Sequence, residues 1–334
     1  MYYKESKLIL EKIKNAKNIV LFCHESADLD SIASNLSMAE VLESFGKNVE
    51  IYSVGKIRND FKFVGSTEKI IVKDPNSIDY SKFDLLIGLD VSELKRFGIK
   101  KEVNFKGIII NIDHHEFSKY GDINLVDNKA GSTSTILYYL FKDWGLDLKK
   151  ETLDKILTGI VADTGIFHFS TNSSSFIFRT VAELIDKGGD YEKTLFFVDQ
   201  CRDLMVYKFW AVAVNKTKID KNNRFAYTSI PYSIFKKYEN YDISTRQISD
   251  TFLRGINDTD FCIVLIERKN GEVSVSVRSR TPGFYVIDLV RSLGGGGHLT
   301  GGGATIKAEN FAKAVKKVLE EARKYARRSE KQSD

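Results

Sequence analysis

Aspartate and histidine residues that could bind metal ions and a phosphate follow several short apolar segments of this sequence. The clearest segment is 107–117, where an isoleucine-rich run leads into Asp113, His114 and His115. A short β-branched run that ends in polar residues predicts a buried strand whose C-terminal end carries the chemistry. Because neighbouring side chains of an extended segment point to opposite sides, we predict that one of His114 and His115 binds a metal and the other faces a substrate.

Two further predicted strands end in residues of the same kinds. Residues 18–23 and 83–89 are apolar runs of strand length. They are followed by His24, Asp28 and Asp30 after the first strand and by Asp90 after the second. A predicted helix over 151–162 ends at Asp163. A carboxylate is unfavourable beside the negative end of a helix dipole, so Asp163 is better explained if a cation lies next to it.

Strands alternate with helices through the first half of the chain. The predicted helices span 3–16, 31–45, 136–144, 151–162 and 173–187, and the predicted strands span 18–23, 49–53, 69–72, 83–89 and 107–112. Asp30 or Ser31 is predicted to cap the helix that ends near Phe45. This alternation predicts an α/β fold with a parallel, Rossmann-like sheet and helices on both faces. Parallel strands end at one edge, which would bring the three polar groups together.

The predicted metal-binding cluster consists of His24, Asp28, Asp30, Asp90, His114 and Asp163. Each residue has an ordinary explanation by itself, since an aspartate can cap a helix or start a turn, and a lone histidine is usually a hydrogen-bonded polar residue. Four carboxylates at one sheet edge, however, repel one another unless positive charge offsets them. Two divalent ions would do so, and these ligands favour Mn²⁺, with Mg²⁺ as the alternative. Two metals about 3.5–4 Å apart form a template for phosphoester hydrolysis, in which Asp90 could bridge them.

Two segments are candidates for binding an anionic substrate. Residues 130–135 precede a helix, and Ser132 and Ser134 with the free N–H groups of the helix start suit an anion. Simple helix capping explains these two serines at least as well. Arg278 and Arg280 lie two apart on a predicted strand and so share one face. They could bind a phosphate or stack on a base, or they could form surface ion pairs.

A third segment is the glycine-rich stretch 294–303, which contains His298. A flexible linker would have this composition, but apolar-periodic residues precede it at 284–293 and more folded chain follows at 304–306. We therefore predict a loop inside a domain whose backbone N–H groups close on a phosphate or sugar. The residues assigned to substrate binding in this loop are Gly295, Gly296, Gly297 and His298.

The second half of the chain has a different pattern of predicted strands and helices. This pattern predicts a separate, smaller α/β domain. Its predicted strands span 211–219, 224–230, 260–267 and 272–279, and its predicted helices span 245–256 and 310–328. The last helix is basic on one side, which indicates a solvated face more readily than nucleic-acid contact. We predict a first domain over 1–188, a helical linker over 189–210 and a second domain over 211–334, with the active site in the cleft between the domains.

The bulk composition agrees with a soluble two-domain protein. The chain has 334 residues, of which 43% are hydrophobic and 28% charged, and a net charge of +5 that suits a phosphate-bearing substrate. No apolar run approaches the roughly 18 residues that cross a bilayer. The N-terminus lacks the apolar region of a signal peptide. Cys23 and Cys262 lie in apolar runs, as buried thiols do. We expect a cytoplasmic protein.

The order of these motifs resembles the DHH phosphoesterase superfamily. The residues that carry the resemblance are His24, Asp28 and Asp30, then Asp90, then Asp113-His114-His115, then Asp163-Thr164-Gly165. The resemblance implies that His24, Asp28 and Asp90 hold one metal. It implies that the second metal is held by Asp30, Asp90, His114 and Asp163. His115 would contact the scissile phosphate, and Asp113 would orient its neighbours without binding a metal.

The second half resembles the DHHA1 domain through Arg278 in a Ser-Val-Arg-Ser strand and the Gly-Gly-Gly-Gly-His run that ends at His298. Together the two resemblances cover about residues 15–325 and are most like the bacterial nanoRNase/pAp-phosphatase group, in which Arg96 would also contact substrate. The implied substrates are short RNA oligonucleotides and nucleotide bisphosphates. No protein partner or membrane is implied, and homodimer formation stays open.

Several other activities remain open at this point. A cyclic-dinucleotide phosphodiesterase, a manganese inorganic pyrophosphatase and a RecJ-like single-strand DNA exonuclease share the metal motifs. The pyrophosphatase would not need the glycine-rich segment, and the exonuclease usually carries additional domains. A catalytically silent nucleotide-binding protein is the alternative from another class, but every predicted ligand is present.

Overall fold

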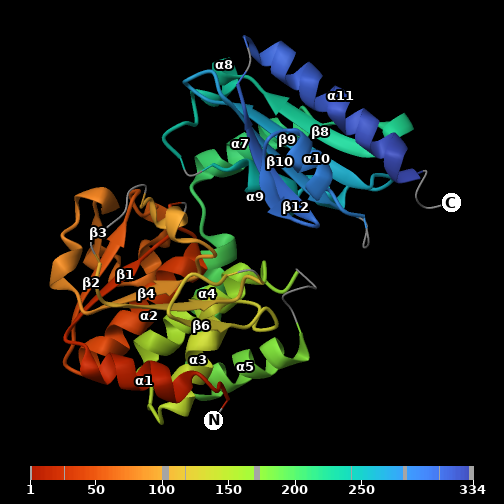
Figure 1. Cartoon of the computed structure of the whole chain (residues 1–334). Helices are drawn as coiled ribbons and strands as arrows, with labels where there is room; N and C mark the ends of the chain where they lie inside the picture. Colours follow the sequence, from red (N-terminus) through yellow and green to blue (C-terminus); the bar gives the residue numbers. More distant parts are fainter. Residues whose placement is uncertain are drawn as a thin grey trace. The chain divides into compact units, whose positions relative to one another are not determined.

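The computed structural model describes residues 2–25, 27–99, 105–116, 118–168, 174–241, 243–280, 284–307 and 309–330, the last four by their backbone alone. The chain divides into two compact units, Met1–Cys201 and Arg202–Asp334 (Figure 1). The division falls within the segment 189–210 that the sequence assigns to a linker. In the part of the chain that is described, no helix is both long enough and apolar enough to cross a membrane.

The N-terminal unit is built on a six-stranded sheet with the order β3-β2-β1-β4-β5-β6. The strands are β1 (Asn18–Phe22), β2 (Asn48–Ser53), β3 (Ile70–Val72), β4 (Leu85–Leu89), β5 (Ile108–Asp113) and β6 (Ile123–Val126). Every neighbouring pair is parallel, so all six C-terminal ends lie at one edge. The predicted α/β fold class is confirmed. Strand β6 was missed because its four residues, Ile-Asn-Leu-Val, carry too short a pattern.

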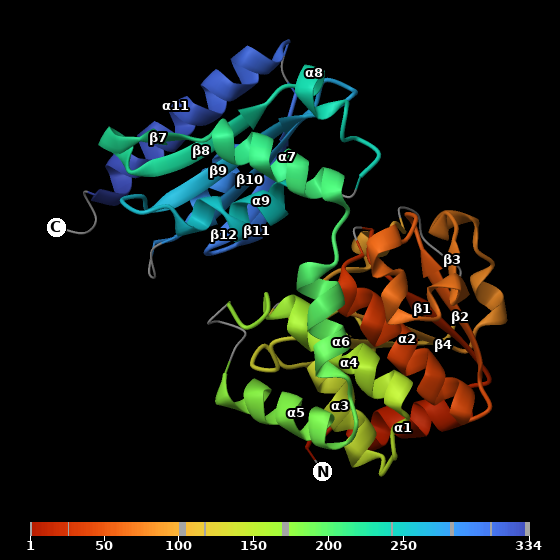
Figure 2. The same cartoon turned by 180° about the vertical axis from the view of Figure 1, so that it is seen from behind.

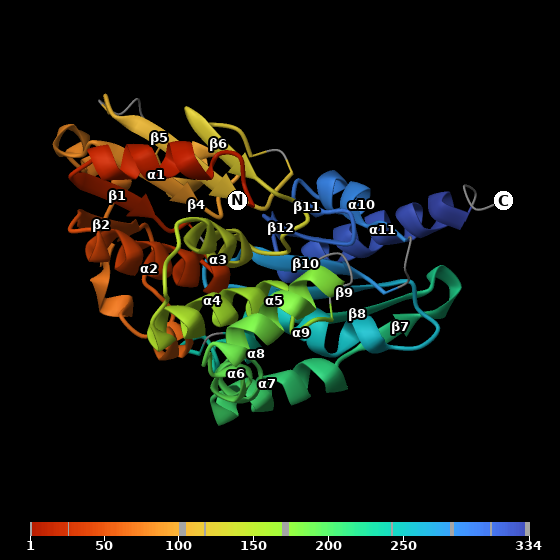
Figure 3. The same ribbon diagram turned by 90° about the horizontal axis from the view of Figure 1, so that it is seen from below.

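The α-helices of this unit pack against one face of the sheet, so the prediction of helices on both faces is wrong. They are α1 (Ser6–Asn15), α2 (Leu29–Ser44), α3 (Thr133–Asp143), α4 (Lys150–Asp163), α5 (Ser175–Asp186) and α6 (Tyr191–Leu195), which continues into a π-helical turn, η6 (Phe196–Gln200). Figure 3 shows α2, α3 and α4 together on one side of the sheet. Buried residues of α1 to α5 form one core with Leu21 of β1 and Ile87 of β4.

Short 3₁₀ turns cover the opposite face. They are η3 (Pro75–Ser77), η4 (Tyr80–Lys82) and η5 (Leu94–Phe97). On this side Phe22 and Leu86 pack with Tyr80 and Phe97 in a smaller core. Two further turns, η1 (Asn59–Val64) and η2 (Thr67–Lys69), lie between β2 and β3, and Phe61 and Val64 of η1 pack in the core on the helix side. The connection between β2 and β4 contains Pro75 and lacks the apolar period of a long helix, so it forms turns instead.

Helix α2 begins two to three residues earlier than predicted. Its N-cap is Asp28, whose Oδ1 accepts a hydrogen bond from the N–H of Ser31 at 3.1 Å. Asp30 therefore lies in the first turn of the helix, where it is buried. At the start of α5 the cap is Ser174, and residue 173, the predicted start of that helix, lies outside the described residues.

The C-terminal unit contains a second six-stranded sheet with the order β11-β12-β10-β9-β8-β7. The strands are β7 (Lys218–Asp220), β8 (Phe225–Ile230), β9 (Phe261–Glu267), β10 (Val273–Ser279), β11 (Gly296–His298) and β12 (Gly301–Ile306). Strands β8 and β9 are parallel and the other neighbours antiparallel. The mixed α/β character of this unit is confirmed.

Helices cover both faces of this second sheet. They are α7 (Leu204–Asn215), α8 (Tyr232–Phe235), α9 (Thr245–Thr251), α10 (Ile287–Ser292) and α11 (Phe311–Glu330), with 3₁₀ turns η7 (Lys221–Asn223) and η8 (Leu253–Gly255). Residues of α10 and α11 form the core on one face, and residues of α7 to α9 form the core on the other. Figure 2 shows α7 and α9 on the face away from α11.

The strand predicted over 211–219 is wrong, because most of it belongs to α7. The apolar run around Trp210 suggested a strand, but the buried residues recur with the helical period at Val206, Phe209, Trp210 and Ala213. The helix is apolar on nearly all sides, which hides that period from a sequence pattern. The true strand β7 is only three residues long.

The glycine-rich stretch 294–303 is an edge hairpin of the sheet rather than the predicted loop. Strand β11 pairs with β12, and β12 pairs in turn with β10. A Cβ on Gly297 would lie 2.4 Å from Gly301 O, and a Cβ on Gly295 would lie 2.2 Å from Gly303 O. Glycine is therefore required here by the close approach of the strands.

Candidate active site

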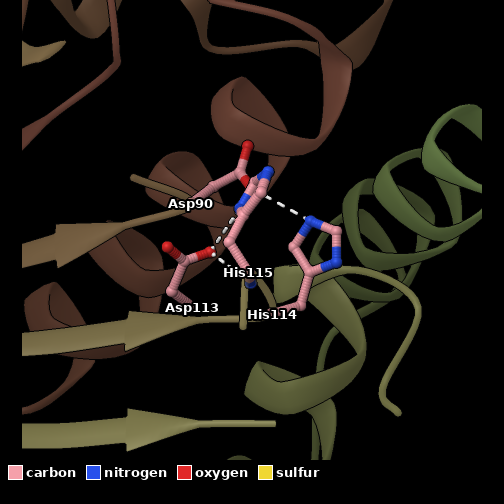
Figure 4. A group of neighbouring side chains, drawn as sticks. All are labelled: Asp90, Asp113, His114 and His115. Atoms are coloured by element: carbon pink, nitrogen blue, oxygen red, sulfur yellow. Dashed lines mark hydrogen bonds and ion pairs between the residues drawn. The ribbon is translucent and has the colours of Figure 1, made fainter. Parts of the chain in front are cut away.

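The structure brings the six predicted metal-binding side chains together at the C-terminal edge of the parallel sheet. Their donor atoms form three overlapping groups, each within 4.8 Å: Asp90 with Asp113, His114 and His115; His24 with Asp28 and Asp90; and Asp30 with His114 and Asp163. Asp90 and His114 each belong to two of these groups. Figure 4 shows Asp90, Asp113, His114 and His115 gathered beyond the strand ends, with contacts from Asp113 to His115 and from Asp90 to His114.

The donor atoms around His114 are spaced like ligands that share an ion, and those around His24 lie slightly farther apart. His24 Nε2 lies 3.8 Å from Asp28 Oδ1 and 3.9 Å from Asp90 Oδ2. His114 Nε2 lies 3.4 Å from Asp90 Oδ1 and 3.3 Å from Asp163 Oδ2. All four distances exceed the usual hydrogen-bond length of about 3.0 Å. Two ligands each about 2.1 Å from one ion stand roughly 3–3.5 Å apart, so the two His114 distances match this spacing and the two His24 distances are slightly longer. Asp90 therefore directs one carboxylate oxygen to each histidine.

Burial and mutual repulsion make the carboxylates of the cluster difficult to ionise together. Asp90 is 3% exposed, and burial followed by the charges of Asp30 and Asp28 raises its pKa well above the ordinary value. Burial and the nearby Asp163 raise the pKa of Asp30 to about 6. Bound dications would offset both shifts by stabilising the ionised carboxylates. A donor set of carboxylates and imidazoles in this condition fits two Mn²⁺ or Mg²⁺ ions.

The backbone at Asp90 is left-handed, with φ of 60°. Its N–H donates to Ile112 O at 3.2 Å, directly after the last paired residues of β4 and β5. Aspartate and asparagine adopt this conformation more readily than other residues with a Cβ. The strand thus ends in a sharp turn at the residue whose carboxylate faces both histidines.

The start of α3 holds the buried carboxylate of Asp30. The N–H of Thr133 donates to Asp30 Oδ2 at 2.7 Å, and the N–H of Ser134 donates to Asp30 Oδ1 at 3.1 Å. Ser132 caps the helix by accepting from the N–H of Thr135 at 3.1 Å. The anion at this helix start is therefore a side chain of the protein, so the prediction that these N–H groups are open to a substrate is wrong.

The two neighbouring histidines have different environments. His114 lies among the carboxylates of Asp30, Asp90 and Asp163. His115 Nδ1 lies 2.8 Å from Asp113 Oδ1, and the backbone N–H of His115 donates to the same oxygen at 3.1 Å. Burial opposes protonation of His115, but the Asp113 hydrogen bond together with the charges of Asp113 and Asp90 outweighs it and raises the pKa of His115. For Asp113, burial is outweighed by that hydrogen bond together with the charges of His115 and His114 and a hydrogen bond from Ser118, so its pKa is lowered.

Two family models match this chain. The DHH family, N-terminal domain, matches residues 18–160, and the DHHA1 domain matches residues 222–324. The chain belongs to the DHH/DHHA1 family. Its Asp113-His114-His115 sequence is the motif at the end of β5, and the Asp/His cluster around it is typical of DHH metal sites.

Similar proteins extend the comparison beyond the family. The bifunctional oligoribonuclease and PAP phosphatase NrnA of Thermus thermophilus is 28% identical over 336 residues, which cover 98% of this chain and 96% of that protein. A probable manganese-dependent inorganic pyrophosphatase of Brevibacillus brevis is 28% identical over 148 residues, 43% of this chain and 47% of that protein. An exopolyphosphatase-related protein from Bacteroides fragilis shares the fold, with a TM-score of 0.88 over 96% of both chains at 24% identity.

Two residues that hold this Asp/His cluster in place were not identified from the sequence. Thr133 donates its N–H to Asp30, and its Oγ1 lies 3.3 Å from Asp90 Oδ1. Gly159, in the middle of α4, allows that helix to approach Asp30. The only local signal for Gly159 was a glycine inside a helical pattern, which is unfavourable unless close packing requires it.

Replacing Gly159 with alanine should destabilise the DHH unit by about 2–3 kcal/mol, although helix propensity alone predicts a gain of about 1 kcal/mol. The added Cβ would lie 2.0 Å from Ser134 Oγ, 2.5 Å from Asp30 Oδ1 and 2.7 Å from Ser134 Cβ. Denaturant unfolding of the metal-free protein measures this change. Gly255→Ala, where nothing lies within 4 Å of the new Cβ, is the matched control. A Gly159→Ala variant as stable as the wild type would contradict the packing seen here.

The predicted substrate-binding residues belong to both units. Arg96 lies in η5 of the DHH unit, and its carbonyl accepts from the N–H of Glu25 at 2.8 Å, beside the segment that carries His24. Arg278 of β10 and His298 of β11 belong to the DHHA1 unit. Arg280 follows β10, and its Nη2 donates to Asn257 Oδ1 at 3.1 Å.

Proposed function

We propose that this DHH phosphoesterase hydrolyses short oligoribonucleotides to mononucleotides and also dephosphorylates 3′-phosphoadenosine 5′-phosphate. The observation that carries the proposal is the match to the Thermus thermophilus oligoribonuclease and PAP phosphatase, which extends over both units rather than the DHH unit alone. The pyrophosphatase relative matches less than half of the chain. A nucleotide substrate gives the DHHA1 unit a role that pyrophosphate would not.

The residues that would hold the two ions divide at Asp90. His24, Asp28 and Asp90 would hold one ion, and Asp30, Asp90, His114 and Asp163 would hold the other. Bound there, divalent ions would supply Lewis acidity that activates water and offsets charge on the phosphoryl oxygens. The protein fixes these ligands beforehand, since Asp30 is bonded to the start of α3 and Asp90 is held by its left-handed turn.

His115 is proposed to act on the phosphate. When Nδ1–H of cationic His115 donates to Asp113, Nε2–H would be the group that donates a proton or hydrogen bond to a phosphate oxygen. The raised pKa of His115 favours the cationic form that such an anion requires. Arg96 and Arg278 are proposed to bind further phosphate oxygens, with the edge strand Gly296–His298 and Gly295 beside it as additional substrate contacts.

The test of this function is a panel of substrates with Mn²⁺: di- to pentaribonucleotides, pGpG, pAp, pyrophosphate and long single-stranded DNA. We expect turnover of the dinucleotides and pAp, and loss of that turnover in a His114→Ala variant. Hydrolysis of pyrophosphate without nucleotide hydrolysis would favour a pyrophosphatase. Processive degradation of long single-stranded DNA would favour a RecJ-type exonuclease. Either result would overturn the proposal.

Replacing Asp113 with asparagine should lower kcat on a dinucleotide by about 10–100-fold, because the residue that orients a catalytic imidazole usually has an effect of this size. The amide keeps the shape of the side chain but loses the charge that favours cationic His115. Steady-state kinetics with saturating Mn²⁺ measure the change. Asp122→Asn removes a carboxylate from the turn before β6, where it accepts the N–H of Ile109 at 2.8 Å, and should leave kcat unaltered. An unchanged kcat in Asp113→Asn would show that Asp113 does not contribute to the reaction.

A further inference from the structure

The guanidinium of Arg278 is partly buried in the DHHA1 unit and held on two of its three nitrogens. Its side chain is 14% exposed. Nε donates to Asp250 Oδ1 of α9 at 2.8 Å, while Nη1 donates to Val277 O at 2.9 Å and to Gly302 O at 3.2 Å. These contacts fix both the position and the plane of the guanidinium.

The third nitrogen, Nη2, has no hydrogen-bond partner among the described residues. Arginine stays charged in proteins even where burial lowers its pKa, as it does for Arg278. The two N–H groups of Nη2, on a cation that the other contacts hold in place, can therefore donate to a ligand with negatively charged oxygens.

The glycine hairpin makes room for this arginine. Arg278 pairs in register with Gly301 of β12. A Cβ on Gly301 would lie 2.7 Å from Arg278 Cδ and 2.9 Å from Arg278 Nη1. The guanidinium can therefore lie across the strand only where residue 301 has no side chain. Part of the glycine run serves the arginine, whatever contact the run makes with a ligand.

Asp250 is the carboxylate on which this arrangement depends. Besides Arg278, it contacts Arg246 of its own helix, whose Nε lies 3.4 Å from Asp250 Oδ2. The three side chains carry a net charge of +1, so the site remains attractive to an anion. Asp250 contacts Nε of Arg278 and not Nη2, the nitrogen that has no partner among the described residues.

We propose that Asp250 is a positioning residue for substrate binding: it holds Arg278 so that Nη2 presents two N–H donors to a phosphate of the nucleotide substrate. This inference rests on the proposed function, in which Arg278 binds substrate. The opposite effect is physically reasonable too, because a carboxylate near an anion site weakens binding when it does not orient the cation. The two effects have opposite signs, which makes the role of Asp250 measurable.

The experiment compares Asp250→Asn with Asp260→Asn. Asp260 forms a two-point ion pair with Arg224 on the same sheet, at 2.9 and 3.1 Å, so it is a matched control for loss of an Arg–Asp pair. For pApA with Mn²⁺ we expect Asp250→Asn to raise KM about 10-fold, the effect of losing roughly 1.4 kcal/mol of binding, with kcat changed less than about threefold. The Kd of AMP, measured by calorimetry without metal, should rise by a similar factor. Asp260→Asn should change neither.

Gly301→Ala gives a second approach that leaves Asp250 in place. It should raise KM and the Kd of AMP by pushing the guanidinium aside, and it tests the proposal if Asp250→Asn does not fold. An unchanged or lower KM in a folded Asp250→Asn protein would overturn the positioning role.

Arg278→Ala separates this inference from the proposed function. If Arg278→Ala raises KM and Asp250→Asn has no additional effect in the double variant, Asp250 acts through Arg278. If Arg278→Ala raises KM and Asp250→Asn does not, the positioning role is wrong while the proposed function stands. If Arg278→Ala leaves KM and AMP binding unaltered, or the wild type neither hydrolyses pApA nor binds AMP, the assignment of Arg278 as a substrate residue is wrong, and the inference about Asp250 falls with it.

Discussion

Asparagine in place of Asp90 should reduce Mn²⁺-dependent hydrolysis of a dinucleotide by about 10³-fold or more, because loss of roughly 4 kcal/mol of transition-state stabilisation has that effect. One Asp90 oxygen faces His24 and the other faces His114. The substitution therefore removes the negative charge that the two sets of predicted metal ligands share. Asparagine is preferred to alanine because it also tolerates the left-handed backbone of this position. The turnover lost is therefore not confounded by a distorted strand end.

The same substitution should stabilise the metal-free protein. Asp90 is buried against the charges of Asp30 and Asp28, which raise its pKa, so removing its charge relieves repulsion. Asp84→Asn is the matched control at the other end of β4. Asp84 accepts the N–H groups of Lys17 and Asn18 at 2.9 and 2.8 Å, and these bonds lower its pKa. Asp84→Asn should lower stability and leave the catalytic step intact. A metal-free Asp90→Asn protein less stable than the wild type would contradict the repulsive cluster.

Saturating Mn²⁺ should raise the melting temperature of the DHH unit by about 10 °C, since a ligand at 1,000 times its Kd adds about 4 kcal/mol and each kcal/mol is worth about 2–4 °C in a domain of this size. This increment should grow between pH 6 and pH 8, because carboxyls and imidazoles must lose their protons to bind the metal.

Without metal, the pH dependence should have the opposite sign. The folded-state pKa of Asp30 is raised to about 6, and those of Asp90 and His114 are also raised. The folded protein therefore binds more protons than the unfolded chain, so the contribution of these groups to stability is lost as pH rises through their folded pKa values. Calorimetry with a chelator at pH 6, 7 and 8 measures this trend. The slope should be smaller in Asp90→Asn, and a melting temperature that rose with pH in the chelated wild type would refute the explanation.

Much of the candidate site could be predicted because its signals are local. Each ligand group follows a β-branched or apolar run that ends abruptly in polar residues, as at Asp90 and at Asp113. Parallel strands place such ends at one edge whatever the details of packing. The alternation of strands and helices was sufficient to predict that edge, and with it the meeting of side chains as distant as His24 and His114.

Other features depend on segments that meet only in the folded chain. That the start of α3 binds Asp30, and not a substrate, depends on a contact across about a hundred residues. Helix α7 resembled a strand because apolar residues on nearly all of its sides hide the amphipathic period. The covering of one face by 3₁₀ turns was equally invisible, since short turns carry no period.

The sequence by itself determined which residues can bind metal and on which strand ends they lie, because residue type and period are written along the chain. Only the tertiary structure decided how these residues are held. Gly159 is required by the approach of α4 to Asp30, and the glycines of β12 are required by Arg278 and by neighbouring backbone. Close packing between elements sets these requirements, and a single sequence shows such a glycine without showing what lies against it.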